Sequence, residues 1–125
     1  MTTTSIPKMT ILYVDTPETS AHFYQQVFGV APVEISATFA MFALPGGFIL
    51  GLWSRHAVEP AASITGGGCE LAIRADTAAD VDDLHTQWQA LGVPMLQAPT
   101  DMEFGRTFLA TDPDGHRIRV FNPPA

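Results

Sequence analysis

Residues 104–121 read as two β-strands joined by a tight turn. The turn is Asp-Pro-Asp-Gly at 112–115, in which proline fixes φ, aspartate tolerates the turn conformation and glycine closes it. The strand after the turn alternates, so Arg117, Arg119 and Phe121 share one face and apolar side chains fill the other. Burying two like charges side by side is costly unless partners or a ligand compensate them. We therefore expect this face to border a cavity.

The chain also repeats itself. Asp15-Thr16 and Asp76-Thr77 each open a predicted helix that ends in Gly-Val, and glycine-containing turns near 44–47 and 112–115 follow in the same order. The offset between the halves grows from 61 residues (15 to 76) to 68 residues (47 to 115). The pattern predicts an α+β fold of two βαβββ modules at about 8–54 and 69–122, joined by a linker at about 55–68.

Apolar alternation and turn residues set the expected elements. One helix is predicted over 16–29, with Thr16 as its N-cap and Gly29 as its stop, and a second over 77–91. In the second helix, a stripe of Val81, Leu84, Trp88 and Leu91 should face the sheet. Strands are predicted near 9–14, 32–35, 38–44, 48–54, 69–75, 94–98, 107–111 and 117–121.

Composition bounds the function. A chain of 125 residues that is 46% hydrophobic and 15% charged is long enough for one folded domain. A single cysteine, Cys69, excludes an internal disulfide and suggests a reducing compartment, and neither a signal peptide nor a membrane-spanning run is recognisable. We expect a cytoplasmic protein. The net charge of −7 argues against nucleic-acid and membrane partners and leaves open a cationic ligand.

Three segments carry a resemblance to a known family. The stretch 104–121 is similar to the C-terminal signature of the glyoxalase, bleomycin-resistance and extradiol-dioxygenase superfamily, which has the vicinal oxygen chelate fold. The segments 14–30 and 70–94 are similar to the openings of its two modules. The resemblance implies pseudo-twofold modules whose curved mixed sheet surrounds a cleft, and a homodimer with clefts at or near the interface.

Enzymes of this family bind a divalent metal through three strand positions, which fall here on Met9, Glu70 and Arg119. Arg119 would have Leu50 as its counterpart in the first module. Only Glu70 offers a ligand suited to a hard cation, because a guanidinium has no free lone pair and a thioether suits soft metals. We therefore expect no metal and no other cofactor. Glu70 and Arg119 should instead form a charge-assisted pair.

Aromatic and methionine side chains would line the cleft and suit a flat organic ligand. Phe104 stands where drug-binding relatives often have a tryptophan before Gly-Arg, and a ring there can stack on an aromatic ligand. Cys69 should point to the core. The full set of expected ligand-binding residues is Phe104, Arg119, Glu70, Arg117, Tyr13, Phe48, Leu50, Leu52, Phe39, Met41 and Trp53.

Two function classes remain open. The first is a metal-independent protein that sequesters a small, partly aromatic compound, as the antibiotic-binding resistance proteins of the family do. The second is a glyoxalase-, lyase- or dioxygenase-type enzyme with a remodelled metal site, in which Glu70 acts with His116 or another nearby donor. No nucleophile–histidine arrangement can be placed, so we assign no catalytic residue. A role for His116 in the turn is favoured over catalysis.

Overall fold

The computed structural model describes residues 5–124. The chain divides between Thr65 and Gly66 into two compact units, each with its own sheet and helix. Both units have the element order strand, helix and three strands, so the expected α+β fold of two βαβββ modules is confirmed. The pseudo-twofold relation between the modules and the shared cleft stay predictions.

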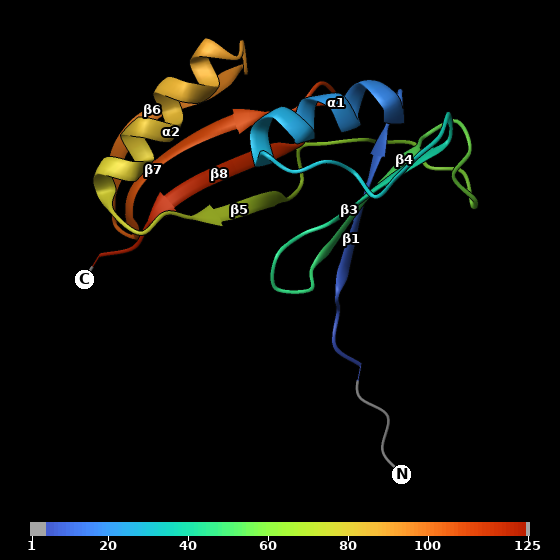
Figure 1. Cartoon of the computed structure of the whole chain (residues 1–125), viewed down its shortest axis with the longest axis horizontal. Helices are drawn as coiled ribbons and strands as arrows, with labels where there is room; N and C mark the ends of the chain where they lie inside the picture. Colours follow the sequence, from blue (N-terminus) through green and yellow to red (C-terminus); the bar gives the residue numbers. More distant parts are fainter. Residues whose placement is uncertain (1–4, 125) are drawn as a thin grey trace. The chain divides into compact units, whose positions relative to one another are not determined.

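The first unit contains a four-stranded mixed sheet in the order β1-β4-β3-β2 (Figure 1). β1 runs parallel to β4, and the other neighbours are antiparallel. The elements are β1 (Met9–Val14), α1 (Pro17–Phe28), β2 (Glu34–Ile35), β3 (Phe39–Ala43) and β4 (Ile49–Ser54).

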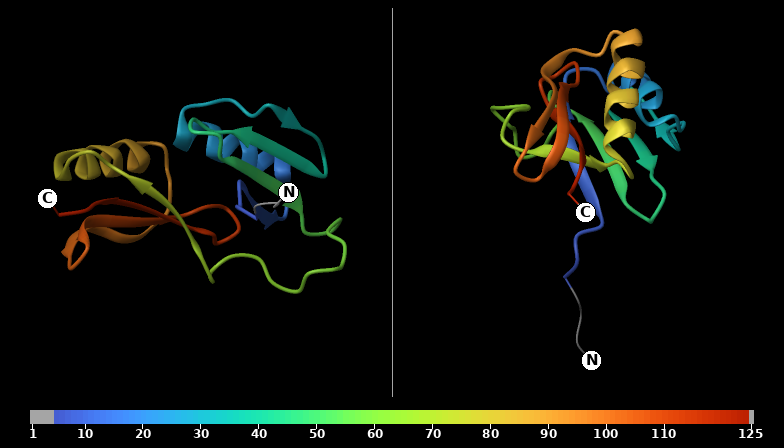
Figure 2. Two further views of the ribbon diagram at one scale, coloured as in Figure 1. Left: turned by 90° about the horizontal axis from the view of Figure 1, so that it is seen from below. Right: turned by 90° about the vertical axis from the view of Figure 1, so that its left-hand side faces the viewer.

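The second unit has the corresponding order β5-β8-β7-β6, with β5 parallel to β8. Its helix lies along one side of the strands, which leaves the other side of this sheet without a helix of its own unit (Figure 2). The elements are β5 (Glu70–Arg74), α2 (Ala78–Ala90), β6 (Met95–Met102), β7 (Gly105–Thr111) and β8 (Arg117–Asn122). We call the sheet side away from the helix the open face of each unit.

The ends of α1 follow the predicted signals, with Thr16 as the N-cap residue. In α2, Thr77 is the N-cap residue, and its side chain accepts a hydrogen bond from the Asp80 backbone N–H at 3.0 Å. Pro17 occupies the first turn of α1, where its missing N–H costs no helical hydrogen bond. Gly29 ends α1 with a φ of 74°, a left-handed conformation that glycine adopts without a Cβ penalty.

Each core lies between a helix and its sheet. In the first unit, Tyr24 of α1 is fully buried, and Phe28 meets Phe42 edge-to-face with ring centroids 6.0 Å apart. In the second unit, Trp88 of α2 meets Phe108 of β7 edge-to-face at 5.2 Å. Burying such rings supplies much of the stabilisation of a small domain.

One expectation for α2 needs correction. Leu91 is 46% exposed, because the helix ends at Ala90 and the chain turns away at Gly92 before this side chain can reach the sheet. His85 of α2 packs edge-to-face on Phe108, with ring centroids 5.3 Å apart. Within residues 5–124, no helix has both the length and the apolar character needed to cross a membrane.

Candidate functional site

A paired arginine and glutamate occupy the open face of the second unit. Arg119 Nε donates to Glu70 Oε1 at 2.7 Å, and Arg119 Nη2 donates to Glu70 Oε2 at 2.9 Å. The predicted pair therefore forms, as a bidentate contact between the neighbouring strands β5 and β8. Such two-pronged, charge-assisted hydrogen bonds are among the strongest that side chains make. The Arg119 side chain is 18% exposed, so solvent reaches the pair only in part.

The remaining nitrogen of the guanidinium is also engaged. Arg119 Nη1 donates to Thr107 Oγ1 at 3.2 Å and to Gln97 Oε1 at 3.3 Å. Gln97 and Thr107 were not predicted as site residues, because a lone polar residue in a strand carries no signal in the sequence. The strand register shows why they meet Arg119. Leu109 of β7 is the cross-strand partner of both Gln97 on β6 and Arg119 on β8, so Gln97 and Arg119 lie on either side of it. Thr107, two residues before Leu109 on β7, pairs with Phe121, two residues after Arg119 on β8.

This geometry fixes the charge state of the pair. The Arg119 hydrogen bonds hold the pKa of Glu70 below its ordinary value, and the charge of Arg117 acts in the same direction. The Glu70 carboxylate in turn raises the pKa of Arg119. Burial opposes both shifts but is outweighed, because each group gains a directly bonded partner of opposite charge. The pair is ionised at neutral pH.

Phe104 lies beside this pair, at the turn between β6 and β7. The Arg119 guanidinium carbon is 5.6 Å from the centre of the Phe104 ring, within cation–π range. Phe121 meets the same ring edge-to-face at 6.4 Å. Phe104 is 42% exposed, so part of the residue remains in contact with solvent. The next residue, Gly105, has a φ of 118°, and a Cβ there would overlap the carbonyl oxygen of Asn122.

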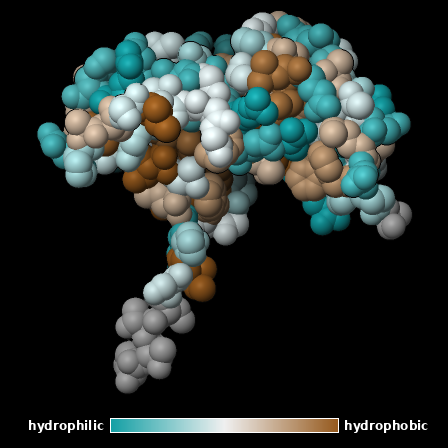
Figure 3. All heavy atoms as spheres, turned by 180° about the vertical axis from the view of Figure 1, so that it is seen from behind, coloured by the Kyte–Doolittle hydropathy of each residue, from teal (hydrophilic) through white to brown (hydrophobic). Residues whose placement is uncertain are grey.

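The open face of the first unit is mainly apolar and aromatic. Tyr13 of β1 and Trp53 of β4 meet edge-to-face with ring centroids 6.4 Å apart. Phe39 is the cross-strand partner of Trp53, and Met41 that of Gly51. Figure 3 shows brown, apolar surface on this unit next to the N-terminal segment. Four predicted lining residues, Tyr13, Phe39, Met41 and Trp53, thus share one face.

The predicted face of Leu50 and Leu52 is wrong. Both side chains are fully buried, and Leu50 is the cross-strand partner of Phe42, which packs on α1. Phe48 lies just before β4 and is exposed. The error is one residue of register, which moves every side chain of a strand to the other face.

The corrected counterpart of Arg119 is Gly51. Ala72 pairs with Arg119 in the second unit, and Ile11 pairs with Gly51 at the equivalent place in the first. A Cβ on Gly51 would come within 2.7 Å of Met9 Cε and 2.9 Å of Phe39 Cζ, so these two side chains fill the space that a larger residue would take. The offset of 68 residues between the two turns predicts this alignment.

His116 stabilises the turn. Its backbone N–H donates to Asp112 Oδ1 at 2.9 Å, and its ring Nδ1 lies 2.8 Å from Asp112 Oδ2. Both residues are buried. Cys69, which we expected in the core, is exposed at the start of β5, because it precedes the first residue that pairs with β8.

The residues at the family's metal positions do not suit a divalent ion. Both carboxylate oxygens of Glu70 accept hydrogen bonds from Arg119. Met9 offers only a thioether, which suits soft metals, and Gly51 has no side chain that could be a ligand. His116 is engaged with Asp112. Among residues 5–124, no three His, Cys, Asp or Glu side chains gather into a metal-binding group.

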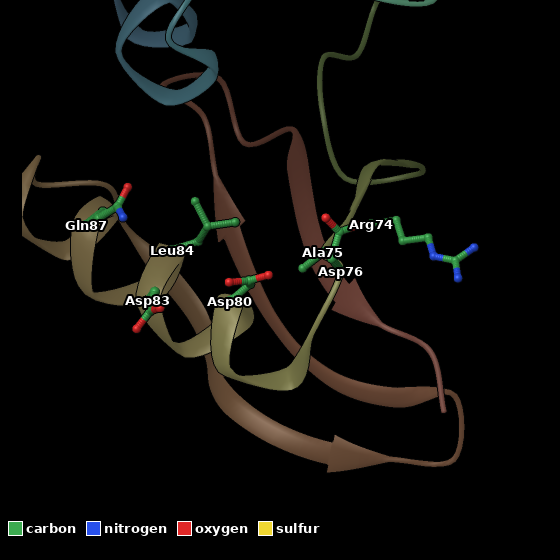
Figure 4. Close-up of a pocket in the computed structure, with 7 residues that line it drawn as sticks. All are labelled: Arg74, Ala75, Asp76, Asp80, Asp83, Leu84 and Gln87. Atoms are coloured by element: carbon green, nitrogen blue, oxygen red, sulfur yellow. The ribbon is translucent and has the colours of Figure 1, made fainter. Parts of the chain in front are cut away.

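A separate hollow of about 320 Å³ lies where β5 leads into α2 (Figure 4). It was not predicted, because its acidic residues read as favourable charges at a helix N-terminus. In Figure 4, the Arg74 side chain points away from Asp80 and Asp83. The lining residues are Arg74, Ala75, Asp76, Asp80, Asp83, Leu84 and Gln87.

Comparison with known proteins agrees with this fold. The family model described as the glyoxalase/bleomycin resistance protein/dioxygenase superfamily matches residues 6–120. The chain belongs to this superfamily, as the sequence motifs predicted. It is 35% identical over 120 residues to the phenazine antibiotic resistance protein EhpR of Enterobacter agglomerans, covering 94% of this chain and 92% of that protein.

Solved structures share the fold. A protein of Agrobacterium tumefaciens with a solution NMR structure is 55% identical, with a TM-score of 0.89, over 98% of this chain and 100% of that one. A glyoxalase-related enzyme from Fulvimarina pelagi is 25% identical, with a TM-score of 0.84, over 97% of this chain and 90% of that one.

Proposed function

We propose that the protein binds a small planar aromatic compound without a metal and confers resistance by sequestering it. The observation that carries this proposal is the bidentate contact between Glu70 and Arg119. Glu70 is the only carboxylate among the residues expected at the family's metal positions, and both of its oxygens accept hydrogen bonds from Arg119. In this proposal the ion pair forms a rigid polar surface against which the ligand lies, and the neighbouring Phe104 ring stacks on the aromatic rings of the ligand.

The aromatic face of the first unit supports the same reading. Tyr13, Trp53, Phe39 and Met41 offer flat, polarisable surface of the kind that small-molecule sites use. The named activity of the relative EhpR is resistance to a phenazine antibiotic. We infer that the compound bound here is of the same chemical class, a fused-ring heteroaromatic. The ligand-contacting residues proposed for the second unit are Phe104, Arg117, Arg119 and Glu70, and those proposed for the first unit are Tyr13, Phe39, Met41 and Trp53.

The alternative, an enzyme with a remodelled metal site, receives no support from the contacts of its two proposed ligands. Glu70 would have to give up two hydrogen bonds to Arg119. His116 would have to leave Asp112, which also binds the backbone of the turn. Rearranging both would break the ion pair between Glu70 and Arg119 and the contact between the His116 ring and Asp112, which costs free energy at partly or fully buried positions.

We also propose that the protein is a symmetric homodimer in the cytoplasm. Strands β1, β2, β5 and β6 are the outer strands of their own sheets, and exposed strand edges are commonly covered by pairing with other chains. Light scattering at micromolar concentration tests the assembly, and a monomeric mass would contradict it.

Isothermal titration of the purified protein with phenazine tests the binding function. We expect saturable 1:1 binding per chain that is unchanged by excess chelator, together with less than stoichiometric Zn, Ni, Fe or Mn by elemental analysis. Binding that disappears with chelator and returns with one of these metals would support the enzyme alternative. The absence of binding to phenazine and to its substituted forms would refute the proposal.

A further inference from the structure

The open face of the second unit has the opposite charge to the chain as a whole. Its strand positions include Arg74, Arg117, Arg119 and Glu70, three arginines against one glutamate, which gives a net charge of +2. The complete chain has a net charge of −7. Asp80 and Asp83 lie on α2 and line the hollow together with Asp76 and Arg74, whose side chain points away from the two α2 carboxylates (Figure 4).

The two arginines of the closing strand differ in availability. Arg119 is engaged by Glu70, Thr107 and Gln97 through all three of its nitrogens. Arg117 is exposed, and within residues 5–124 no carboxylate lies within ion-pair distance of it. Glu70 is its cross-strand neighbour but is already committed to Arg119.

Arg117 therefore keeps a complete set of donors for an external acceptor. A guanidinium matches the two oxygens of a carboxylate, so an anionic group can bind it in the same two-pronged way that Glu70 binds Arg119. Positions 117 and 119 are about 7 Å apart along the strand. Phe104 lies over Arg119, so an acid of several fused rings has the reach to place its carboxylate on Arg117 and its rings beside Phe104.

We propose that the ligand is an aromatic carboxylate and that Arg117 is the residue that selects its negative charge. This inference rests on the proposed binding function and narrows its ligand class. It replaces the cationic ligand that the acidity of the whole chain left open, because a cation beside Arg117 would meet its positive charge while Glu70, its cross-strand neighbour, is engaged by Arg119. Coulomb repulsion at such distances is only partly screened by salt.

Titration with a matched pair of compounds tests the inference. Phenazine-1-carboxylate and phenazine-1-carboxamide have the same rings and nearly the same shape, and they differ in charge at neutral pH. We expect the wild-type protein to bind the carboxylate about tenfold more tightly at low salt. Arg117→Gln should remove this preference by weakening carboxylate binding about tenfold while changing carboxamide binding less than twofold.

Lys8→Gln is the matched control, because it removes one positive charge from an exposed position before β1. It should change neither affinity by more than twofold. Equal affinities for the two compounds in the wild type would overturn the selection of an anion, and equal loss of both in Arg117→Gln would overturn the charge role of that residue. If neither compound nor unsubstituted phenazine binds, the proposed binding function itself fails. If the two phenazines bind equally well, only the selection of an anion by Arg117 fails.

Discussion

Arg119 and Glu70 satisfy each other through two parallel hydrogen bonds of 2.7 and 2.9 Å across strands β5 and β8. The pair falls on two positions at which the resemblance to the superfamily's enzymes led us to expect a metal ligand. A bidentate pair fixes the plane of the guanidinium, and Thr107 and Gln97 fix it further. At these two positions the sheet surface therefore carries an ion pair whose guanidinium is held by four hydrogen bonds.

The first prediction concerns the stability that this pair contributes. Glu70→Gln replaces one acceptor oxygen by an N–H donor that faces the guanidinium, so we expect the free energy of unfolding to fall by about 1–2 kcal/mol. Urea unfolding of both proteins measures the difference. Asp101→Asn is the control: Asp101 pairs with Arg106 but is mostly exposed, so its loss should cost less than about 0.5 kcal/mol. Equal effects in the two variants would contradict a special role for the Glu70 pair.

The second prediction concerns pH. Because the folded state lowers the pKa of Glu70, ionised Glu70 stabilises the fold above the ordinary carboxyl pKa of about 4.3. This contribution should be lost as the pH falls through the lower, folded-state pKa. The stability difference between wild type and Glu70→Gln should therefore be constant from pH 7 to pH 5 and shrink below about pH 4. A difference that persists undiminished at pH 2 would show that packing rather than charge causes it.

The third prediction concerns metal. Excess EDTA or phenanthroline should leave the melting temperature of the wild type unchanged, because Glu70 and His116 are held by Arg119 and Asp112. Differential scanning calorimetry with and without chelator measures this. A drop of several degrees would mean that a metal stabilises the protein and that the donor set has been misjudged.

The sequence predicted the pair but not its surroundings. Glu70 and Arg119 follow from family motifs and strand alternation, both local patterns. Gln97 and Thr107 reach Arg119 through the pairing of β6, β7 and β8. That pairing includes register shifts between Met95 and Thr100, and such irregularities leave little trace in a single sequence.

The misplacement of Leu50 and Leu52 has a different cause. Apolar residues run without interruption from Phe48 to Trp53, so hydrophobicity alone cannot assign a face in β4. Gly51 was overlooked because a glycine offers no side chain to count. Its role is to leave space that Met9 and Phe39 occupy. Contacts of this kind depend on strand register and are visible only in three dimensions.

The fourth prediction concerns the turn that holds Phe104. Gly105→Ala should lower the free energy of unfolding by about 2 kcal/mol or more, because a Cβ there overlaps the Asn122 carbonyl and the φ of 118° is strained for alanine. Gly47→Ala is the control, since Gly47 has a φ of 85° and nothing within 4 Å of an added Cβ. It should cost about 1–2 kcal/mol from the left-handed backbone alone. If Gly105→Ala lowers the free energy of unfolding by less than Gly47→Ala does, the backbone of Gly105 does not lie as close to the Asn122 carbonyl as the structure has it.

The fifth prediction concerns Phe104 itself. Phe104 is partly exposed, and Arg119 and Phe121 hold it beside the ion pair. If a planar ligand stacks on this ring, Phe104→Ala should weaken phenazine binding by about 1–3 kcal/mol. Phe104→Trp should keep or improve the affinity, because indole presents a larger π-surface. Isothermal titration measures the affinities.

Melting curves of the same variants separate stacking from packing. Phe104 lies in a turn and does not belong to the buried core, so both substitutions should lower the melting temperature by only a few degrees. Leu96→Ala removes another exposed apolar side chain, from β6 of the same hairpin, and should leave phenazine affinity unchanged. If Phe104→Ala unfolds the protein, the ring is structural. If the folded variant binds phenazine as tightly as the wild type, the ligand does not stack on Phe104.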